Sequence, residues 1–358
     1  MNTTPTTMKA IVYTEFGPPD VLRLEDAARP EPKRGEILVR VWASSVNFGD
    51  IMARSFRSVT PRGFNMPFLF WFVAKMAMGW RKPKRRILGN EFAGDVEAVG
   101  RDVERFKPGD QVFGCASDRF GAYAEYLTLS EKAPVALMPA NLSYDEAAVI
   151  PYGAVHALSL LRRAKLQPGQ TILINGASGG IGAAAVQIAK HLGADVTAVC
   201  GGARLDYVRA LGADRAIDYA EQDFTRSGET FDVVFDILGL TPFSRGRHSL
   251  APRGIILYAS FKMRHLMAMA LTSRSGGRRA VCALAPGSLQ DLLAVKALAD
   301  EGKLKAIIDK RFPMEEAAEA HRYVETGQRK GSVVIVCKAP DEGHGRNGSR
   351  ATGRPLSE

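Results

Sequence analysis

The chain has 358 residues, of which 46% are hydrophobic and 24% charged, a balance that allows a sizeable buried core and excludes wholesale disorder. At roughly 150 residues per domain, this length predicts two domains. The most apolar window, residues 67–80, would make a helix of about 21 Å, short of the roughly 30 Å hydrocarbon core of a bilayer. We therefore expect no membrane-spanning segment, and the N-terminal residues lack the pattern of a secretory signal.

The cysteines and the charge distribution bear on compartment and partners. The four cysteines lie far apart in the sequence, so they predict neither a disulfide framework nor a clustered metal site, and we expect a cytoplasmic protein. The net charge of +10 is concentrated, because residues 51–90 hold nine basic residues and no acid, and residues 261–279 hold five more with no acid. The net charge of these two segments together is larger than the net charge of the whole chain, so the remaining residues are net negative. The pattern favours an anionic ligand or surface and argues against a nucleic-acid partner.

The first half of the chain predicts mainly strands. Short runs rich in valine and isoleucine, separated by glycine and proline, cover residues 8–17, 36–47, 91–100 and 110–114. Residues 141–164 then change to a helical period, with Ser143 as the expected N-cap and Glu146 at capping-box spacing.

From residue 170 onward, strands and helices alternate. Strands are expected at 171–177, 195–200, 231–239, 253–260, 278–285 and 332–337, and helices at 182–193, 203–212 and 289–303. Gly193 and Gly212 are expected to end the first two helices. Such alternation predicts βαβ units around a parallel sheet, so the predicted fold class is α/β. The polar residues 339–358 are interpreted as a disordered tail.

A glycine-rich turn joins the first strand of this alternating region to its helix. The strand TILIN runs into GASGGIG, in which Ala177, Gly179 and Gly182 stand in register with the three glycines of a dinucleotide-binding turn. Small residues are needed because the backbone there must approach a pyrophosphate at a helix N-terminus, where unpaired N–H groups favour anions. The candidate cofactor-binding residues of this turn are Ala177, Ser178, Gly179, Gly180, Ile181 and Gly182.

The end of the next strand indicates which dinucleotide binds. NAD sites place an acid there to hydrogen-bond the ribose hydroxyls, whereas this chain reads CGGAR over residues 200–204. A carboxylate would repel a 2′-phosphate, and Arg204 offers that phosphate a bidentate partner. The alternative is that Arg204 is a solvated arginine at a helix start. The pattern predicts NADPH, an NADP-type cofactor.

Several motifs, in order along the chain, resemble one protein family. They are MKAIVYTEFGPPDVL, SSVNFGD, ILGNEFAGDVEAVG, RFKPGDQVFG, LINGASGGIG and AEAHRYVETGQRKGSVVI, and they span residues 8–338. The chain resembles the medium-chain dehydrogenase/reductase superfamily, in its zinc-free, quinone-oxidoreductase-like branch. This resemblance implies a GroES-like, β-rich catalytic domain at 8–145, completed by 287–338. It also implies a Rossmann domain with a doubly wound parallel sheet at 146–286.

The same resemblance adds cofactor contacts. Tyr219 matches a family position near the adenosine phosphate, and Leu238 and Gly239 belong to the family motif FDILG, which we also expect at the cofactor. We also expect a homodimer.

The positions that bind catalytic zinc in related alcohol dehydrogenases hold no zinc ligand here. Ser44 and Ser45 stand where those relatives have a cysteine, Asn90 replaces a histidine, and their third ligand falls near Pro151. Because zinc needs three protein ligands to activate an alcohol, the resemblance implies an enzyme without zinc. The easier chemistry is then hydride delivery to an electrophilic acceptor, namely a quinone or an α,β-unsaturated carbonyl compound.

Three side chains are candidates for catalysis. Asn47 and Asp50, in the family's N-x-x-D element, are expected on the cleft face, with capping of a turn as the alternative. Tyr152 is a candidate proton donor for the oxyanion that forms after hydride transfer, with a core tyrosine as the alternative. His156 is interpreted as a satisfied helix histidine. No tyrosine follows soon after the N-x-x-D element, which argues against enoyl-thioester reduction.

Residues 51–90 are aromatic as well as basic. Phe68, Phe70, Trp71 and Phe72 are interpreted as a lid lining the pocket of a flat hydrophobic acceptor. The alternative is an interfacial anchor that makes peripheral contact with an anionic membrane.

The predicted function is an NADPH-dependent, zinc-independent oxidoreductase that delivers hydride to a quinone or an α,β-unsaturated carbonyl acceptor. Two alternatives stay open. One is an NADPH-binding, membrane-associated protein with little turnover, and the other is a zinc-free carbonyl reductase similar to alcohol dehydrogenases.

Overall fold

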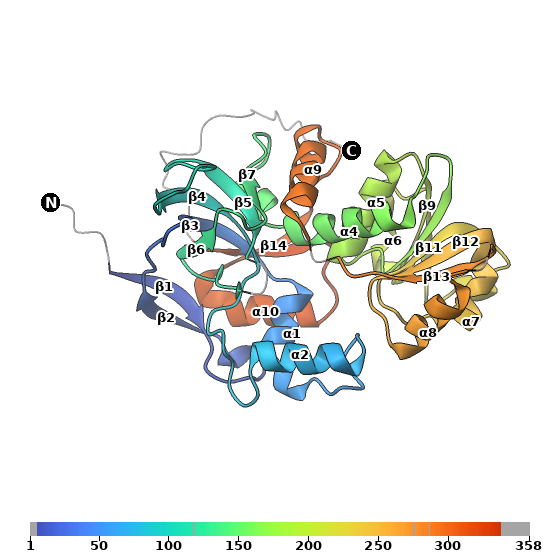
Figure 1. The fold of residues 1–358 in the computed structure, drawn as a ribbon, viewed down its shortest axis with the longest axis horizontal. Helices are drawn as coiled ribbons and strands as arrows, with labels where there is room; N and C mark the ends of the chain where they lie inside the picture. The colour runs from blue at the N-terminus through green and yellow to red at the C-terminus, as the bar shows by residue number, and fades with distance from the viewer. Residues whose placement is uncertain (1–5, 117–118, 275, 286, 338–358) are drawn as a thin grey trace, which may run out of the picture.

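The computed structural model describes residues 6–116, 119–274, 276–285 and 287–337. These residues form two large β-sheets, one in each half of the molecule, with helices α4 (Pro151–Ala164) and α9 (Leu289–Asp300) between them (Figure 1). The predicted tail at 339–358 lies outside the described residues. No helix within the described part is both long enough and apolar enough to cross a bilayer.

A seven-stranded sheet forms one half of the molecule. Its order is β14-β15-β3-β4-β5-β7, and β6 pairs with β3 off this path. The bounds are β3 (Glu36–Ser45), β4 (Glu91–Val99), β5 (Gln111–Cys115), β6 (Tyr126–Ser130), β7 (Val135–Leu137), β14 (Ile308–Pro313) and β15 (Ser332–Val336). A separate antiparallel pair is made by β1 (Thr7–Val12) and β2 (Arg23–Ala28). Because β14 and β15 come from the far end of the sequence, the chain leaves this sheet after β7 and later returns to it.

A six-stranded sheet forms the other half, and every neighbouring pair in it is parallel. Its order is β10-β9-β8-β11-β12-β13. The bounds are β8 (Thr171–Asn175), β9 (Asp195–Cys200), β10 (Arg215–Asp218), β11 (Phe231–Asp236), β12 (Leu250–Tyr258) and β13 (Arg279–Cys282). Strands added outward on both sides of β8 and β11 make a doubly wound sheet, in which ligands bind at the carboxyl ends of the two central strands. The predicted α/β class is confirmed.

The remaining helices surround these sheets. They are α1 (Phe48–Arg54), α2 (Phe68–Met78), α3 (Tyr144–Ala147), α5 (Gly180–His191), α6 (Leu205–Ala210), α7 (Phe243–Gly246), α8 (Met263–Thr272) and α10 (Ala317–Glu325). Helix α4 packs against α5 and α9, and one buried apolar cluster runs from Ala43 and Phe113 of the seven-stranded sheet to Ile174 of the parallel sheet. This shared cluster holds the two halves together. Whether the domain boundaries fall at 145 and 286 stays a prediction.

The helical region expected over 141–164 is interrupted. Its start is as predicted: the Ser143 hydroxyl accepts from the Glu146 N–H at 3.3 Å, and the Ser143 N–H donates to the Glu146 carboxylate at 2.9 Å. The helix nevertheless ends at Ala147, and α4 begins at Pro151. A proline has no N–H to continue a helix but is well suited to the first turn of a new one. The helical region predicted over 141–164 is therefore two helices, α3 and α4.

A stability prediction follows from the packing of β3 on β4. Gly94 lies inside β4 opposite Val41, and a Cβ at Gly94 would lie 2.0 Å from the Arg40 carbonyl oxygen. The sheet must shift to relieve this clash because the oxygen belongs to the backbone. We expect Gly94→Ala to lower the free energy of unfolding by about 1–3 kcal/mol in a denaturant titration.

Gly276→Ala is the matched control for this prediction. A Cβ at Gly276 would meet nothing within 4 Å, so its effect should stay within about 0.5 kcal/mol. Equal stability of Gly94→Ala and the wild type would contradict the close approach of the two strands.

Candidate active site

The glycine-rich turn between β8 and α5 takes the shape that the sequence predicts, with one difference. Gly176 has a φ of 91°, and the N–H groups of Gly176 and Ala177 both donate to the Val199 carbonyl at 3.1 Å. The residue that needs positive φ is therefore Gly176. Ala177, placed at the first glycine of the motif, is fully buried beneath the turn. The turn is thus anchored to β9 by its own backbone.

The glycines at the start of α5 serve two separate purposes. A Cβ on Gly182 would lie 2.2 Å from the Gly176 carbonyl oxygen, so this glycine allows the helix to pack on the turn. Gly179, the N-cap, would place a Cβ 3.6 Å from that same oxygen and near nothing else, and Gly180 has open space. The helix N-terminus is therefore accessible at Gly179 and Gly180, where backbone N–H groups favour an anion.

The loop after β11 adjoins this turn. The side chain of Leu238 lies 3.2 Å from the position of a Cβ on Gly176, and Leu238 is half exposed. Gly239 has a φ of 64°, and its N–H donates to the buried Asp236 carboxylate at 3.1 Å. The Asn175 side chain donates to the same carboxylate at 3.1 Å. These contacts hold the carboxyl ends of β8 and β11 together, and they bring Leu238 and Gly239 to the phosphate turn.

Arg204 and Tyr219 meet at the end of β9. A Cβ on Gly201 would lie 3.3 Å from Arg204 Nη2 and 3.3 Å from the Tyr219 hydroxyl, which puts both groups on one side of the strand end. The other guanidinium nitrogen, Arg204 Nη1, donates to the Gly327 carbonyl at 2.6 Å. One guanidinium nitrogen of Arg204 is therefore bonded within the protein. The other, Nη2, lies on the same side of the strand end as the Tyr219 hydroxyl.

The same strand end also holds an acid that the sequence reasoning missed. Asp218 ends β10, and a Cβ on Gly202 would lie 2.4 Å from Asp218 Oδ2. The expectation that no acid stands near Arg204 is therefore wrong in three dimensions. The signal was parallel pairing, because Asp218 is the register partner of Cys200.

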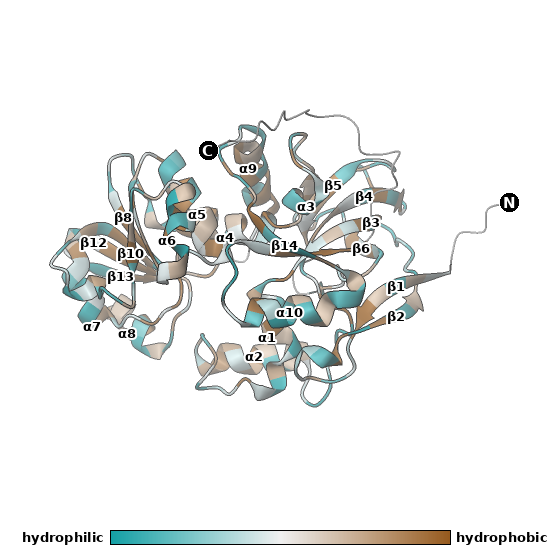
Figure 2. Ribbon diagram, turned by 180° about the vertical axis from the view of Figure 1, so that it is seen from behind, coloured by the Kyte–Doolittle hydropathy of each residue, from teal (hydrophilic) through white to brown (hydrophobic). Residues whose placement is uncertain are grey.

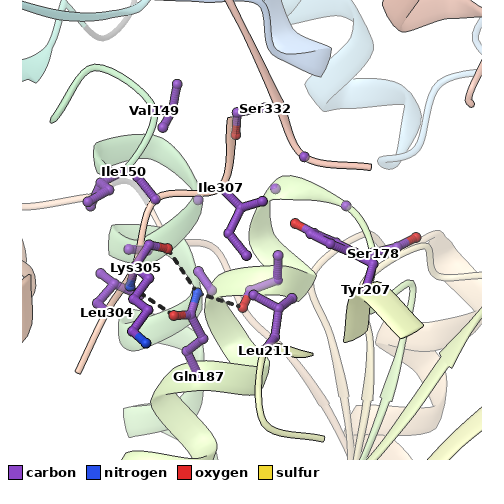
Figure 3. A pocket seen from close by; sticks show the side chains of 18 of the residues that line it. Val149, Ile150, Ser178, Gln187, Tyr207, Leu211, Leu304, Lys305, Ile307 and Ser332 are labelled. Atoms are coloured by element: carbon purple, nitrogen blue, oxygen red, sulfur yellow. Dashed lines mark hydrogen bonds between the residues drawn. The ribbon is translucent and has the colours of Figure 1, made fainter. Parts of the chain in front are cut away.

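A pocket lies beside the phosphate turn, between the two halves of the chain (Figure 3). Ser178, Gly179 and Gly180 line it, and its opposite wall comes from residues 304–307, 329, 331 and 332. Gln187 of α5 fixes that wall: its amide oxygen accepts from the Lys305 N–H at 2.8 Å, and its amide nitrogen donates to the Lys305 carbonyl at 3.2 Å (Figure 3). Asn47, Asp50 and Tyr152 are not among the lining residues.

Arg329 is a second residue that the sequence reasoning passed over. It lines this pocket, is half buried, and donates to the Val46 carbonyl at 3.5 Å, next to Asn47. Burial lowers its pKa, and the nearby positive charge of Arg204 lowers it further. A desolvated cation facing a phosphate turn is suited to hold an anion. The motif QRKGSVVI carried this residue, but nothing in the sequence placed it opposite α5.

Asn47 and Asp50 form a capping box at the start of α1. Asn47 Oδ1 accepts from the N–H groups of Gly49 and Asp50, and Asp50 Oδ2 accepts from the Asn47 N–H at 3.1 Å. Asp50 Oδ1 accepts from the Gly89 N–H at 3.0 Å, which ties α1 to the entry of β4. Burial raises the pKa of Asp50 to about 7. The capping alternative is thus realised, and Asn47 Nδ2 is buried beside the Glu91 carboxyl.

Glu91 connects the seven-stranded sheet with α4. Its carboxylate accepts from the Ser45 hydroxyl and from the Tyr152 N–H, the latter at 2.6 Å. The Ser44 hydroxyl donates to the Glu91 carbonyl at 2.6 Å. Burial raises the pKa of the Glu91 carboxyl to about 7, so it is poised between its two protonation states near neutral pH.

Tyr152 and His156 lie one turn apart on α4. Their rings are 4.3 Å apart, and His156 Nδ1 lies 2.7 Å from the Tyr152 carbonyl oxygen, as expected for a histidine bonded within its helix. Burial, then the charges of Glu91 and Asp50, raise the pKa of Tyr152 to about 12. The phenol therefore stays protonated at neutral pH and lies close to both carboxyl groups.

The four aromatic residues predicted to form a lid differ in their contacts and exposure. The Trp71 indole N–H donates to the Val59 carbonyl at 2.8 Å, and Phe70 meets Phe261 edge to face. Phe68 and Phe72 are 61% and 42% exposed. Trp71 and Phe70 are thus tied to the body of the protein, whereas Phe68 and Phe72 are exposed; that the four line a substrate pocket stays a prediction.

The residues at the positions that bind zinc in related dehydrogenases have other contacts or structural places here. Ser44 and Ser45 both donate to Glu91, and α4 begins at Pro151. Across the described ranges, no group of three or more histidine, cysteine, aspartate or glutamate residues is arranged to hold a metal ion.

Comparison with known families now adds to this geometry. The alcohol dehydrogenase GroES-like domain family matches residues 33–140, and the family described as zinc-binding dehydrogenase matches residues 211–335. The 2-methylene-furan-3-one reductase of Solanum lycopersicum is 31% identical over 348 residues, covering 92% of this chain and 79% of that protein. The NADPH-dependent alkenal/one oxidoreductase of Arabidopsis thaliana is 30% identical, covering 92% and 80%.

The solved structures agree with these matches. The quinone oxidoreductase from Coxiella burnetii superposes with a TM-score of 0.79 at 30% identity, covering 93% of this chain and all of that one. The chain therefore belongs to the medium-chain dehydrogenase/reductase superfamily, in its quinone-oxidoreductase-like branch, and it is an oxidoreductase.

The buried Glu91 carboxyl predicts a pH dependence of stability. Its pKa is about 7 in the folded protein, compared with about 4.3 in an unfolded chain, so between these values the folded state binds more protons. The free energy of unfolding should therefore fall as pH rises from about 5 to about 7, by up to about 1.4 kcal/mol per unit from this carboxyl.

Glu91→Gln tests this prediction because glutamine keeps the shape and does not titrate. Its amide oxygen accepts from the Tyr152 N–H, and its amide nitrogen donates to the Ser45 hydroxyl. Denaturant titrations of both proteins at several pH values should show a shallower fall in the variant. Parallel profiles would mean that Glu91 is not protonated in the folded state near pH 6.

Proposed function

We propose that this oxidoreductase uses NADPH, requires no zinc, and delivers hydride to a quinone or an α,β-unsaturated carbonyl compound. The observation that carries the proposal is the open phosphate turn at α5 with Arg204 and Tyr219 converging at the adjacent strand end. The printed names of its relatives, an alkenal/one reductase and a quinone oxidoreductase, support the acceptor class.

The residues present fit an NADP-type dinucleotide. The exposed backbone at Gly179 and Gly180 can receive the pyrophosphate, and Arg329 supplies a cation across the same pocket. Arg204 Nη2 and the Tyr219 hydroxyl can hold a 2′-phosphate. NADPH, when bound, supplies the hydride. The protein's share is to fix the orientation of the reactants and to exclude water.

Asp218 opposes the assignment of NADPH and should reduce the preference for NADPH over NADH. A carboxylate beside Gly202 can accept from ribose hydroxyls and repels a 2′-phosphate, which favours NADH. Arg204 offsets that repulsion with a charge-assisted pair. The preference for NADPH therefore depends on Arg204, and it should rise further in Asp218→Asn.

Two donors are suited to the oxygen that gains negative charge in the reaction. The Tyr152 phenol is protonated at neutral pH, and Asn47 Nδ2 is a buried amide donor beside the Glu91 carboxyl. Both are anchored, Asn47 by its cap and Tyr152 by α4. We propose that they hydrogen-bond the acceptor oxygen, and that Asp50 and Glu91 adjust the local charge.

The side chains at the zinc positions are poor zinc donors. The Ser44 and Ser45 hydroxyls are already bonded to Glu91, Asn90 offers an amide, and Pro151 has no donor atom in its side chain. Zinc activation needs thiolate, imidazole or carboxylate ligands with one open position. This donor chemistry supports reduction of acceptors that are electrophilic without a metal.

Steady-state assays with quinones and enones test the proposal directly. With NADPH, turnover is expected on at least one acceptor class and should survive overnight treatment with a chelator. Tyr152→Phe should lower kcat by about 10- to 1,000-fold, the cost of removing one oxyanion donor, without a matching loss of NADPH binding. Loss of activity on chelation, restored by zinc, would overturn the zinc-independent mechanism.

Arg204 gives a separate test of cofactor choice. Arg204→Ala should weaken NADPH binding at least tenfold, or about 1.4–3 kcal/mol for a charge-assisted contact, and should leave NADH binding nearly unchanged. Fluorescence titration measures both affinities. Gly179→Val is the control that should remove both, because a side chain there stands at the helix N-terminus and its Cβ meets the fold only at an ordinary contact distance of 3.6 Å from the Gly176 carbonyl oxygen. Equal losses in Arg204→Ala would contradict a 2′-phosphate contact.

A further inference from the structure

The two acid-free basic segments of the sequence meet on one edge of the molecule. Segment 51–90 contains α2, and segment 261–279 contains α8. Both helices lie at the lower edge in the two opposite views (Figures 1 and 2). They are joined directly, because the Lys262 ammonium donates to the Arg62 carbonyl at 2.9 Å and Phe70 meets Phe261 edge to face.

Each of these helices displays an apolar stripe to solvent. On α2, Leu69, Val73 and Met76 are 68%, 59% and 52% exposed. Phe68, Phe72 and Trp80 extend the same surface. On α8, the exposed side chains follow at intervals of four, and they are Met263 at 57%, Met267 at 60% and Leu271 at 83%. Several exposed apolar side chains on each of two segments that touch one another indicate an interaction site.

The exposed face of α2 belongs to a well-anchored helix. Trp71 is bonded to the Val59 carbonyl and stacks on Phe68 at 5.7 Å. The ammonium of Lys75 is buried and lies 5.4 Å from the Phe56 ring. These contacts fix which side of α2 packs on the protein, so the opposite side remains exposed to solvent.

Basic side chains border this apolar surface. Arg81, Lys82, Lys84, Arg85 and Arg86 follow α2 directly and are all exposed. None of the five has an ion-pair partner within the described part of the chain, and residues 51–90 contain no acid. The Lys84 N–H donates to the Met78 carbonyl at 2.9 Å, which folds this basic segment back onto the end of α2.

We infer that α2 and α8 form a docking face for an anionic phospholipid bilayer. Aromatic and aliphatic side chains enter the interfacial region, while arginine and lysine remain at the level of the headgroups. A second copy of the chain is a poorer occupant, because a symmetric contact would bring two unpaired basic segments together. No residue of α2 or α8 lines the pocket beside the phosphate turn, and the inference does not depend on the proposed function.

Vesicle flotation tests the docking face with the full chain. Vesicles of phosphatidylcholine alone are compared with vesicles containing about 30 mol% phosphatidylserine, at about 0.1 M and about 0.5 M NaCl. The wild type should bind the anionic vesicles at low salt, at least about tenfold more weakly at high salt, and negligibly to phosphatidylcholine.

Three variants divide the contributions. Leu69→Asn with Val73→Asn tests α2, Met267→Gln with Leu271→Asn tests α8, and replacing the five basic residues by glutamine tests the charge. Each should weaken binding to anionic vesicles at least about fivefold. Because all these side chains are exposed, thermal unfolding and NADPH-linked turnover on soluble acceptors should stay unchanged.

Matched controls remove equal chemistry elsewhere. Leu137→Asn with Leu293→Asn removes two half-exposed leucines, and glutamine at Lys33, Arg101, Lys107, Lys132 and Arg253 removes five exposed charges. Both controls should bind vesicles within about twofold of the wild type. Absence of wild-type binding, or equal losses in the controls and the α2 and α8 variants, would overturn the inference. The inference would also be overturned if the wild type formed a dimer that does not bind vesicles and that the α2 substitutions dissociate.

Discussion

The pairing of β15 with β3 is the contact on which the rest of the structure depends. It joins residues nearly 300 positions apart, with Val334 opposite Ser45 and Ile335 opposite Ser44. The Val46 N–H donates to the Val333 carbonyl at 2.9 Å just beyond the paired residues. Since β15 is reached only after the parallel sheet is complete, this pairing encloses that sheet as an insertion. It also brings Arg329 and Ser332 to the wall opposite the phosphate turn.

Two buried carboxyl groups connect that sheet to the elements around the active site. Asp50 joins α1 to Gly89, and Glu91 joins β4 to Ser45 and to the first turn of α4. Each accepts at least two hydrogen bonds, which compensates for part of the cost of burial. Among the described residues neither forms an ion pair, and burial raises both pKa values to about 7. Structural support and a response to pH therefore reside in the same side chains.

The surface formed by α2 and α8 is distinct from the pocket between the two halves of the molecule. The pocket lies between the two halves of the molecule, whereas α2 and α8, with exposed apolar side chains, lie at its lower edge (Figure 2). A docking surface can change there without disturbing the phosphate turn, because α2 is attached through Trp71 and Phe70 and contributes nothing to either sheet. A lipophilic acceptor would be concentrated at a bilayer next to such a face.

The sequence alone determined the elements whose causes are local. The alternation of strands and helices after residue 170, the capping box at Ser143 and the glycine turn before α5 depend on residues within a few positions of each other. The family resemblance added the GroES-like region and the oxidoreductase class, which the comparisons confirmed. Periodicity alone missed the break between α3 and α4, although Pro151 was its visible cause.

Only the tertiary structure decided which distant residues share a site. Asp218 reaches Gly202 because β10 pairs with β9, and Arg329 faces α5 because β15 returns to β3. Likewise, the helical pattern of 68–78 is apolar almost all round, so sequence could not say which side would be buried. The packing of Trp71 against Val59 settled it and left Leu69 and Val73 exposed. Neighbourhood in space is set by strand order and packing, which short-range sequence patterns do not encode.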